Sequence, residues 1–177
     1  MVWCKRLIIC DMNIQLRKWI LSDKESLKAL CNAVDRQYLS DRLPSPYTDS
    51  DAEWWLNMVT EAEGKSGLFR AVTVDGQVVG SISVERREDV YRIDGELGYM
   101  LQTDHWSQGI MTQAVAQITR LAFELLDIQR ISAHVFAPNI ASAKVLEKNG
   151  YELEATIRKG AIKDGKVYTV VRYGVVR

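Results

Sequence analysis

The strongest constraint on the fold is a strand–helix–strand unit in residues 95–136. Residues 95–101 have the composition of an extended segment, and residues 110–126 place apolar side chains every three or four positions, as an amphipathic helix does. Residues 131–135 then alternate apolar and other side chains as a strand does. A helix that joins two strands of one sheet in this way makes a right-handed crossover and leaves those strands parallel. The unit therefore predicts one parallel strand pair.

The rest of the chain predicts antiparallel strands and additional helices. Asp75-Gly76 between two strand-like runs is the strongest short hairpin signal, and Asp164-Gly165 predicts a second tight turn. Capping-box spacings at Ser22–Glu25 and Ser50–Glu53 predict two helix starts. The expected strands are 14–19, 68–74, 77–84, 93–101, 131–135, 151–158 and 167–175, and the expected helices are 22–34, 50–61, 110–125 and 141–148. The predicted fold class is α+β, or α/β by a looser convention, with a mostly antiparallel mixed sheet and flanking helices.

The loop of residues 104–114 joins the first strand of this unit to its helix. A glycine-containing loop that leads into a helix leaves several backbone N–H groups unpaired, with the positive end of the helix dipole behind them. Such a site binds anions, most often a phosphate or pyrophosphate. The sequence therefore predicts that the backbone of Gln108, Gly109, Ile110, Met111 and Thr112 binds a phosphate group.

Composition excludes several classes of function. The chain has 177 residues, and we expect residues 14–177 to form one domain after an extension, residues 1–13, which is either a floppy segment or an extra edge strand. Its apolar run Leu7–Cys10 is too short for a signal-peptide core or a membrane span. The formal net charge of zero, with no run of Lys and Arg, argues against nucleic-acid or membrane binding. Three cysteines without a CxxC pair, and only two histidines, argue against a metal site and favour a reduced, cytoplasmic protein. We interpret His105 and His134 as incidental.

Four stretches, taken together, resemble the GNAT superfamily of Gcn5-related N-acetyltransferases, and in particular its RimJ/RimL-like branch. They occur in the expected order: Ile14-Gln15-Leu16-Arg17, Gly95-Glu96-Leu97-Gly98-Tyr99-Met100-Leu101, Trp106-Ser107-Gln108-Gly109-Ile110-Met111-Thr112, and Asn139-Ile140-Ala141-Ser142 leading to Leu146-Glu147-Lys148-Asn149-Gly150-Tyr151. The resemblance implies a sheet whose parallel pair is splayed. It also implies transfer of an acetyl group from acetyl-CoA to a primary amine.

Two departures from the family pattern bear on the site. In the phosphate loop, whose pattern is Gln/Arg-x-x-Gly-x-Gly/Ala, Trp106 and Met111 replace the first and last residues and Gly109 is kept. Backbone N–H groups do not depend on these side chains, so we expect the loop to bind phosphate through its backbone. Many members also carry a tyrosine that protonates the leaving thiolate, and Leu146 stands at that position. Ser142, or a water that it holds, is the candidate substitute.

The resemblance and the chemistry of acetyl-CoA together assign roles to single residues. The loop at 108–112 would face the pyrophosphate, and Asn139 is a plausible helix cap that contacts CoA. The pantetheine amides would pair with unpaired backbone where the parallel strands part, around 99–101 and 135–139. A backbone N–H near Met100 or Leu101 would stabilise the negative charge that develops on the thioester oxygen. Glu96 would accept the proton of the amine, directly or through a water.

The acceptor stays open at the level of the sequence. We favour a protein or peptide N-terminal α-amine, because about a tenth of such amines are neutral at pH 7 and lysines far less often are. A small amine such as a polyamine, an antibiotic or an amino acid is the alternative. A third reading is a non-catalytic sensor that binds acyl-CoA. Family members are monomers or dimers, so a homodimer is possible.

Overall fold

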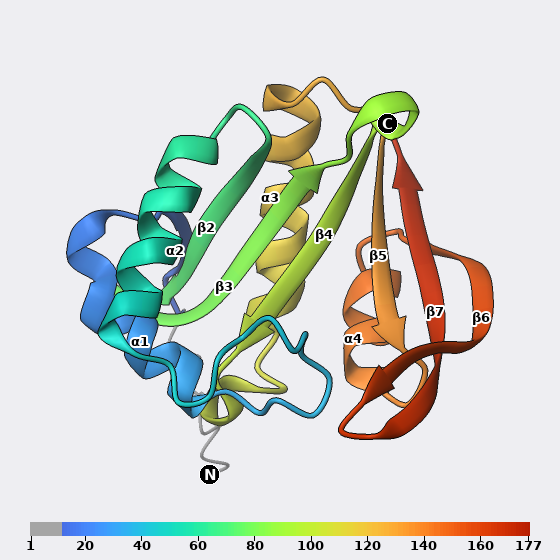
Figure 1. Cartoon of the computed structure of the whole chain (residues 1–177). Coiled ribbons are helices and arrows are strands. Elements are labelled where there is room, and N and C mark those ends of the chain that lie inside the picture. The colour runs from blue at the N-terminus through green and yellow to red at the C-terminus, as the bar shows by residue number, and fades with distance from the viewer. Residues whose placement is uncertain (1–11) are drawn as a thin grey trace, which may run out of the picture.

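A computed structural model of the chain describes residues 12–177, so most of the expected extension, residues 1–13, lies outside the described part. Within it, seven strands form one mixed sheet in the order β1-β2-β3-β4-β5-β7-β6, shown in Figure 1. The strands are β1 (Ile14–Lys18), β2 (Gly67–Val74), β3 (Gln77–Arg86), β4 (Asp94–Leu101), β5 (Arg130–Phe136), β6 (Glu152–Lys163) and β7 (Lys166–Val176). Only β4 and β5 pair in parallel among these strands, which confirms the predicted crossover.

In the described part of the chain, four α-helices cover the sheet in two layers (Figure 1). They are α1 (Lys24–Ala33), α2 (Asp49–Ala62), α3 (Ile110–Leu125) and α4 (Ile140–Glu147), with short 3-10 turns at Leu21–Asp23, Asp89–Tyr91 and Thr103–His105. Helices α3 and α4 pack on one face and bury Ile118 and Leu146 in the larger core. Helices α1 and α2 pack on the other face, where Leu30 and Leu56 belong to a second core. None of the helices in residues 12–177 is long and apolar enough to cross a membrane.

The two predicted tight turns are confirmed. Asp75 and Gly76 have φ angles of 49° and 84°, and Asp164 and Gly165 have φ angles of 49° and 74°. Positive φ at both central residues is the signature of a type I′ turn, whose twist matches that of the strands it joins. The β6–β7 hairpin is longer than the sequence pattern indicated, because β6 continues to Lys163 through an irregularity between Ile157 and Ala161.

The predicted capping boxes are wrong in both places. Helix α2 begins two residues before Asp51, where Thr48 Oγ1 accepts from the Asp51 N–H at 3.3 Å and Asp51 Oδ2 accepts from the Thr48 N–H at 2.8 Å. This box has the same spacing as Ser50–Glu53 and lies two residues earlier, so both were compatible with the sequence. Before α1, Asp23 binds the Arg17 guanidinium at 2.6 and 2.8 Å, and that ion pair fixes the turn instead of a Ser22 cap.

Candidate active site

The parallel pair of β4 and β5 is short and then opens. Pairing covers three positions, from Asp94 opposite Arg130 to Glu96 opposite Ser132. Beyond this point β4 stays paired with β3 through Leu101, and β5 stays paired with β7 through Phe136. Figure 1 shows the two strands diverging toward the N-terminus of α3. The facing edges of both strands are therefore unpaired along residues 97–101 and 133–136, which is the splay that the resemblance implied.

The register of β3 and β4 shows which backbone groups face this gap. The Arg87 N–H donates to the Asp94 carbonyl and the Gln102 N–H to the Val79 carbonyl, both at 2.9 Å. Backbone groups of an antiparallel pair alternate between the two sides of a strand, so Met100 points toward β3, whereas Tyr99 and Leu101 point into the gap. Of the two N–H groups expected to face the thioester oxygen, the pairing favours that of Leu101.

The loop before α3 has the backbone geometry of an anion site. Ser107 and Gly109 have φ angles of 60° and 78°, and no side chain caps the helix. The first backbone bond of this turn runs from the Gln113 N–H to the Gly109 carbonyl, so the N–H groups of residues 110–112 have no acceptor within the described chain. Nothing lies within 4 Å of the position that a Cβ of Gly109 would occupy. These observations fit a pyrophosphate held by backbone.

The two departures in the loop keep this backbone available. Met111 points into the core and is 6% exposed, so its side chain does not cover the outer surface of the loop. Trp106 donates from its indole Nε1 to the Leu101 carbonyl at 3.0 Å. That bond ties the loop to the end of β4. The Gln108 side chain folds back onto the Asp104 carbonyl at 2.9 Å, which leaves the N–H of Gln108 as its contribution to phosphate binding.

Ser142 lies beside Tyr99, whose side chain had no predicted role. Tyr99 Oη and Ser142 Oγ are 2.7 Å apart, and Asn139 Oδ1 accepts from the Ser142 N–H at 3.2 Å. Asn139 is therefore the cap of α4, as expected, and its bond also sets the position of Ser142. Burial raises the pKa of Tyr99 to about 12, although the bond to Ser142 opposes the shift, so the phenol keeps its proton at neutral pH. Leu146 is fully buried in the larger core.

Glu96 lies on the opposite face of the sheet from Tyr99. Tyr99 packs against the core under α3, whereas Met100 packs against the core under α1 and α2, and Glu96 shares the face of Met100 because strand side chains alternate. Arg87 Nη2 donates to Glu96 Oε2 at 3.1 Å, and His134 Nδ1 lies 3.1 Å from Oε1. The Glu96 side chain remains 47% exposed, so an approaching amine can reach this cluster.

Three aromatic rings stand beyond Glu96 on the same side of β5. Phe136, at the end of β5, lies 5.7 Å from Tyr38 and 5.2 Å from Tyr168 between ring centroids. Tyr38 comes from the segment between α1 and α2, and Asp41 of that segment binds Lys163 of the β6–β7 hairpin at 2.5 Å. Segments distant in sequence therefore meet at the open end of the gap. Tyr47 of the same segment is 5% exposed and belongs to the second core, so it does not face the gap.

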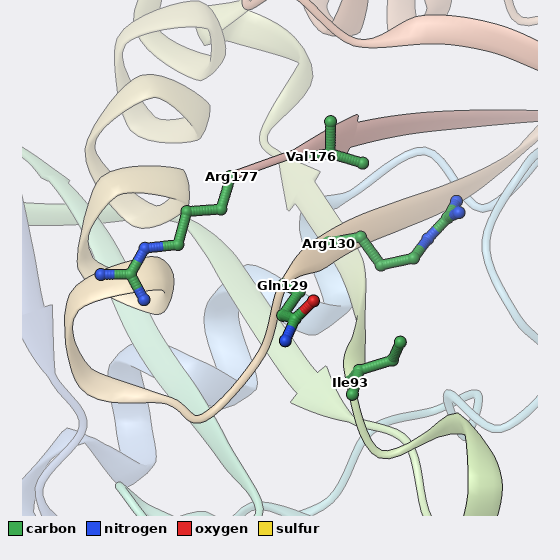
Figure 2. Close-up of a pocket in the computed structure, with 5 residues that line it drawn as sticks. All are labelled: Ile93, Gln129, Arg130, Val176 and Arg177. Atoms are coloured by element: carbon green, nitrogen blue, oxygen red, sulfur yellow. The ribbon is translucent and has the colours of Figure 1, made fainter.

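The pocket drawn in Figure 2 lies at the other end of the parallel pair. Ile93, Gln129 and Arg130 line it together with Val176 and Arg177. The Gln129 N–H donates to the Ile93 carbonyl at 2.8 Å and the Arg177 N–H to the Gln129 carbonyl at 2.9 Å, so its backbone is paired. The pocket lies where the pairing of β4 and β5 begins, at Asp94 and Arg130, whereas the gap opens after Glu96 and Ser132, so the pocket is separate from the gap.

Comparison with known proteins identifies the family. The uncharacterized N-acetyltransferase YoaA of Bacillus subtilis is 28% identical over 101 residues, a match that spans 57% of this chain and little more than half, 56%, of that protein. The L-amino acid N-acetyltransferase AaaT of Escherichia coli is 23% identical over 137 residues, which are 77% of this chain and 76% of that protein.

The fold matches a solved structure along nearly its whole length. The ribosomal L7/L12 alpha-N-protein acetyltransferase RimL, in complex with coenzyme A, superposes with a TM-score of 0.83 at 19% identity, over 92% of this chain and 93% of that one. A family model described as an acetyltransferase (GNAT) domain matches residues 13–152. The chain therefore belongs to the GNAT family of acetyltransferase domains.

Proposed function

We propose that the protein is an acetyl-CoA-dependent N-acetyltransferase whose acceptor is the N-terminal α-amine of a protein or peptide. The observation that carries this proposal is the arrangement around the gap between β4 and β5. Glu96 and its partners lie on one face of the sheet, and Ser142 with Tyr99 lies on the other. A reaction that removes a proton from an amine and gives one to a leaving group can use two separate proton-transfer groups, and the two faces of the sheet each provide one.

The loop and the gap provide the groups that would hold the co-substrate. The N–H groups of Gly109, Ile110, Met111 and Thr112 suit the pyrophosphate, and the open edge of β4 suits the amides of the pantetheine arm. When bound, acetyl-CoA supplies the acetyl group as a thioester. The Leu101 N–H, which faces the gap, would stabilise charge on the thioester oxygen.

Proton removal and proton donation would then take place on opposite faces of the sheet. Glu96 and the groups bound to it take the proton that the amine loses. On the other face Ser142 holds a proton at Oγ for the leaving sulfur, and Tyr99, which stays protonated at neutral pH, can replace that proton over 2.7 Å. Asn139 caps α4 and keeps Ser142 in place. Asn139 therefore contributes at the CoA site by positioning Ser142.

The exposure of the Glu96 cluster supports a chain end as acceptor. A carboxylate that is 47% exposed can be approached from solvent by an extended peptide terminus, without a pocket that encloses the whole substrate. The fold likeness to RimL, which acts on a ribosomal protein terminus, is consistent with this choice. The rings of Tyr38, Phe136 and Tyr168 would then contact the first side chains of the peptide.

A free amino acid is the second candidate, favoured by the similarity to AaaT. A panel of peptides beginning with Ser, Ala or Met, free amino acids, polyamines and an aminoglycoside, each assayed for CoA release and for acetylated product, separates the candidates. Acetylated peptides are the expected result. Turnover of one small amine with every peptide untouched would overturn the peptide assignment. Calorimetric CoA binding without turnover of any amine would favour the sensor reading.

A further inference from the structure

His134 lies at the proton-accepting face of the gap, although the sequence pattern indicated no role for it. It belongs to β5 and lies two residues beyond Ser132, the last residue of β5 that pairs with β4. Its side chain shares a face with Ser132 and Phe136, because Ala133 and Val135 enter the larger core. The ring is 33% exposed at the point where the strands part.

The contact with Glu96 determines which ring nitrogen is free. Glu96 Oε1 lies 3.1 Å from His134 Nδ1, and a carboxylate can only accept, so Nδ1 carries the hydrogen. In the neutral ring the lone pair is then on Nε2. No hydrogen bond to Nε2 is found within residues 12–177. A carboxylate that orients an imidazole through Nδ1 is the arrangement by which many enzymes prepare a base.

Arg87 completes the cluster by holding the other oxygen of the carboxylate. Its Nη2 donates to Glu96 Oε2 at 3.1 Å, so each Glu96 oxygen already accepts one bond, and the carboxylate cannot swing away from the ring without losing both. An imidazole is ordinarily a stronger base than a carboxylate by about two pH units, and a proton acceptor works best when it titrates near the working pH. The free nitrogen of His134 is therefore the better acceptor of the two.

We propose that Nε2 of His134 accepts the proton of the acceptor amine and that Glu96 is a positioning residue that orients His134 and stabilises the resulting imidazolium. The inference rests on the proposed function and names its base. The amine nitrogen forms a bond to the acetyl carbon as the carbon–sulfur bond breaks. The proton lost by nitrogen passes to Nε2, and the sulfur takes a proton from Ser142 Oγ as Tyr99 Oη gives one to Oγ. Proton exchange with solvent then returns His134 and Tyr99 to their starting states.

Three charged groups from three different elements lie around His134. Glu96 faces it from β4, Arg87 lies behind Glu96 after β3, and Arg172 is its register partner on β7. Arg172 is engaged with Glu154 of β6 at 3.3 Å, which offsets part of its charge. Among the described residues, Glu96 is the carboxylate that contacts the ring. The two guanidinium groups nearby, those of Arg87 and Arg172, are each paired with a carboxylate, Glu96 and Glu154 respectively.

Steady-state kinetics on an accepted peptide tests the catalytic role. His134→Gln should lower kcat/KM about 100-fold at pH 7, as loss of a general base does, with unchanged calorimetric affinity for CoA. Glu96→Gln should lower it about 10-fold. Imidazole added to His134→Ala should restore part of the rate, and Arg120→Gln, at an exposed ion pair on α3, controls for a surface substitution. A His134→Gln enzyme within twofold of wild type would overturn the proposal, as would a Glu96→Gln loss much larger than the His134→Gln loss.

A spectroscopic measurement tests the pair without any substrate. Nitrogen-15 shifts at pH 8 should show His134 with its hydrogen on Nδ1, and Glu96→Gln should move the ring toward the more usual Nε2–H form. Because the chain has two histidines, His134→Gln assigns the signals. A ring with its hydrogen on Nε2 in the wild type would overturn the orientation by Glu96. A wild type that shows the expected tautomer and binds CoA but acetylates no amine would overturn the proposed function and the catalytic role with it.

Discussion

Two carboxylates, Glu63 and Glu96, each bind an arginine beside the same sheet, yet their surroundings differ. Glu63 follows α2, and its Oε2 accepts from Arg70 Nη1 at 2.6 Å and from the Phe69 N–H at 3.0 Å. The side chains of Glu63 and Arg70 are 12% and 6% exposed. Glu96 and Arg87, in contrast, are 47% and 34% exposed, and their contact is longer, at 3.1 Å.

The difference in burial indicates that one pair stabilises the fold and that the other is accessible for chemistry. Burial makes it costly to leave either member of the Glu63–Arg70 pair alone, so that pair maintains the end of α2 against β2. An exposed pair contributes little to stability, and its members stay accessible to substrate. Glu96 also lies where β4 and β5 part, and its second partner is an imidazole. Burial and position, more than residue type, therefore separate the two roles.

Removing the buried carboxylate should have the largest effect. Glu63→Gln leaves the Arg70 guanidinium without a counter-charge in a site that water hardly reaches, and we expect the free energy of unfolding to fall by about 3 kcal/mol. Urea denaturation followed by circular dichroism measures this change. Glu96→Gln is the matched control and should change stability by less than about 1 kcal/mol. Equal losses in the two variants would contradict the division of roles.

The Glu63–Arg70 pair also predicts how the loss of unfolding free energy in Glu63→Gln depends on pH. Burial alone would raise the pKa of Glu63, but the hydrogen bonds from Arg70 and the Phe69 N–H outweigh burial and lower it. A carboxyl whose pKa is lower in the folded state stabilises the fold above its unfolded value, about 4.3, and loses that contribution as the pH falls through the folded value. The difference in free energy of unfolding between wild type and Glu63→Gln should be constant from pH 7 to about 5 and shrink below about 4. A difference that grows as the pH falls would contradict the ion pair.

Substitution of the exposed carboxylate, Glu96, should have a small effect on stability and a larger effect on the reaction rate. We expect Glu96→Gln to lower kcat/KM about 10-fold, which is about 1.4 kcal/mol of barrier, because His134 loses the group that orients it. The thermal midpoint should stay close to that of wild type. Peptide acetylation and differential scanning calorimetry on one preparation give both numbers. A 10-fold loss that is matched by a large fall in the midpoint would instead indicate a structural role.

The sequence predicted the order of elements because periodicity and turn residues are local signals. Asp75-Gly76 adopts the expected turn, and the unit at 95–136 gives the parallel pair. Both predicted helices form, but the capping residues of α2 were wrong, because Thr48–Asp51 and Ser50–Glu53 share one spacing and only the contacts that form in three dimensions choose between them. Likewise, Ser22 was expected to cap α1, whereas Asp23 fixes this turn by binding Arg17, a contact that the local sequence does not indicate.

The candidate site was predicted less fully, because its partners come from different elements. Glu96, Ser142 and the loop follow from the family resemblance, and their roles remain predictions. Tyr99 and Ser142 are 43 residues apart, and Glu96 and His134 are 38 apart, so neither contact leaves a mark in local sequence. One signal was available for His134. On a strand that alternates, it lies opposite to Ala133 and Val135 and therefore on the same face as Ser132 and Phe136.

A half-buried hydroxyl pair offers the finest test of the rule that burial marks a structural role. Tyr99→Phe removes the partner of Ser142, and we expect about a fivefold loss in kcat/KM with unchanged CoA affinity, equivalent to one ordinary hydrogen bond of about 1 kcal/mol. Tyr151→Phe is the matched control, because Tyr151 Oη lies 2.7 Å from Thr119 Oγ1 and burial raises its pKa to about 12 as well. Both variants lose a similar bond from the same core, so both should lose similar stability. Only Tyr99→Phe should lose rate, since only Tyr99 can return a proton to Ser142 at the gap. If the two variants lose rate equally, the Tyr99 hydroxyl is structural. The rule that buried groups have structural roles would then hold for the Tyr99–Ser142 pair as well.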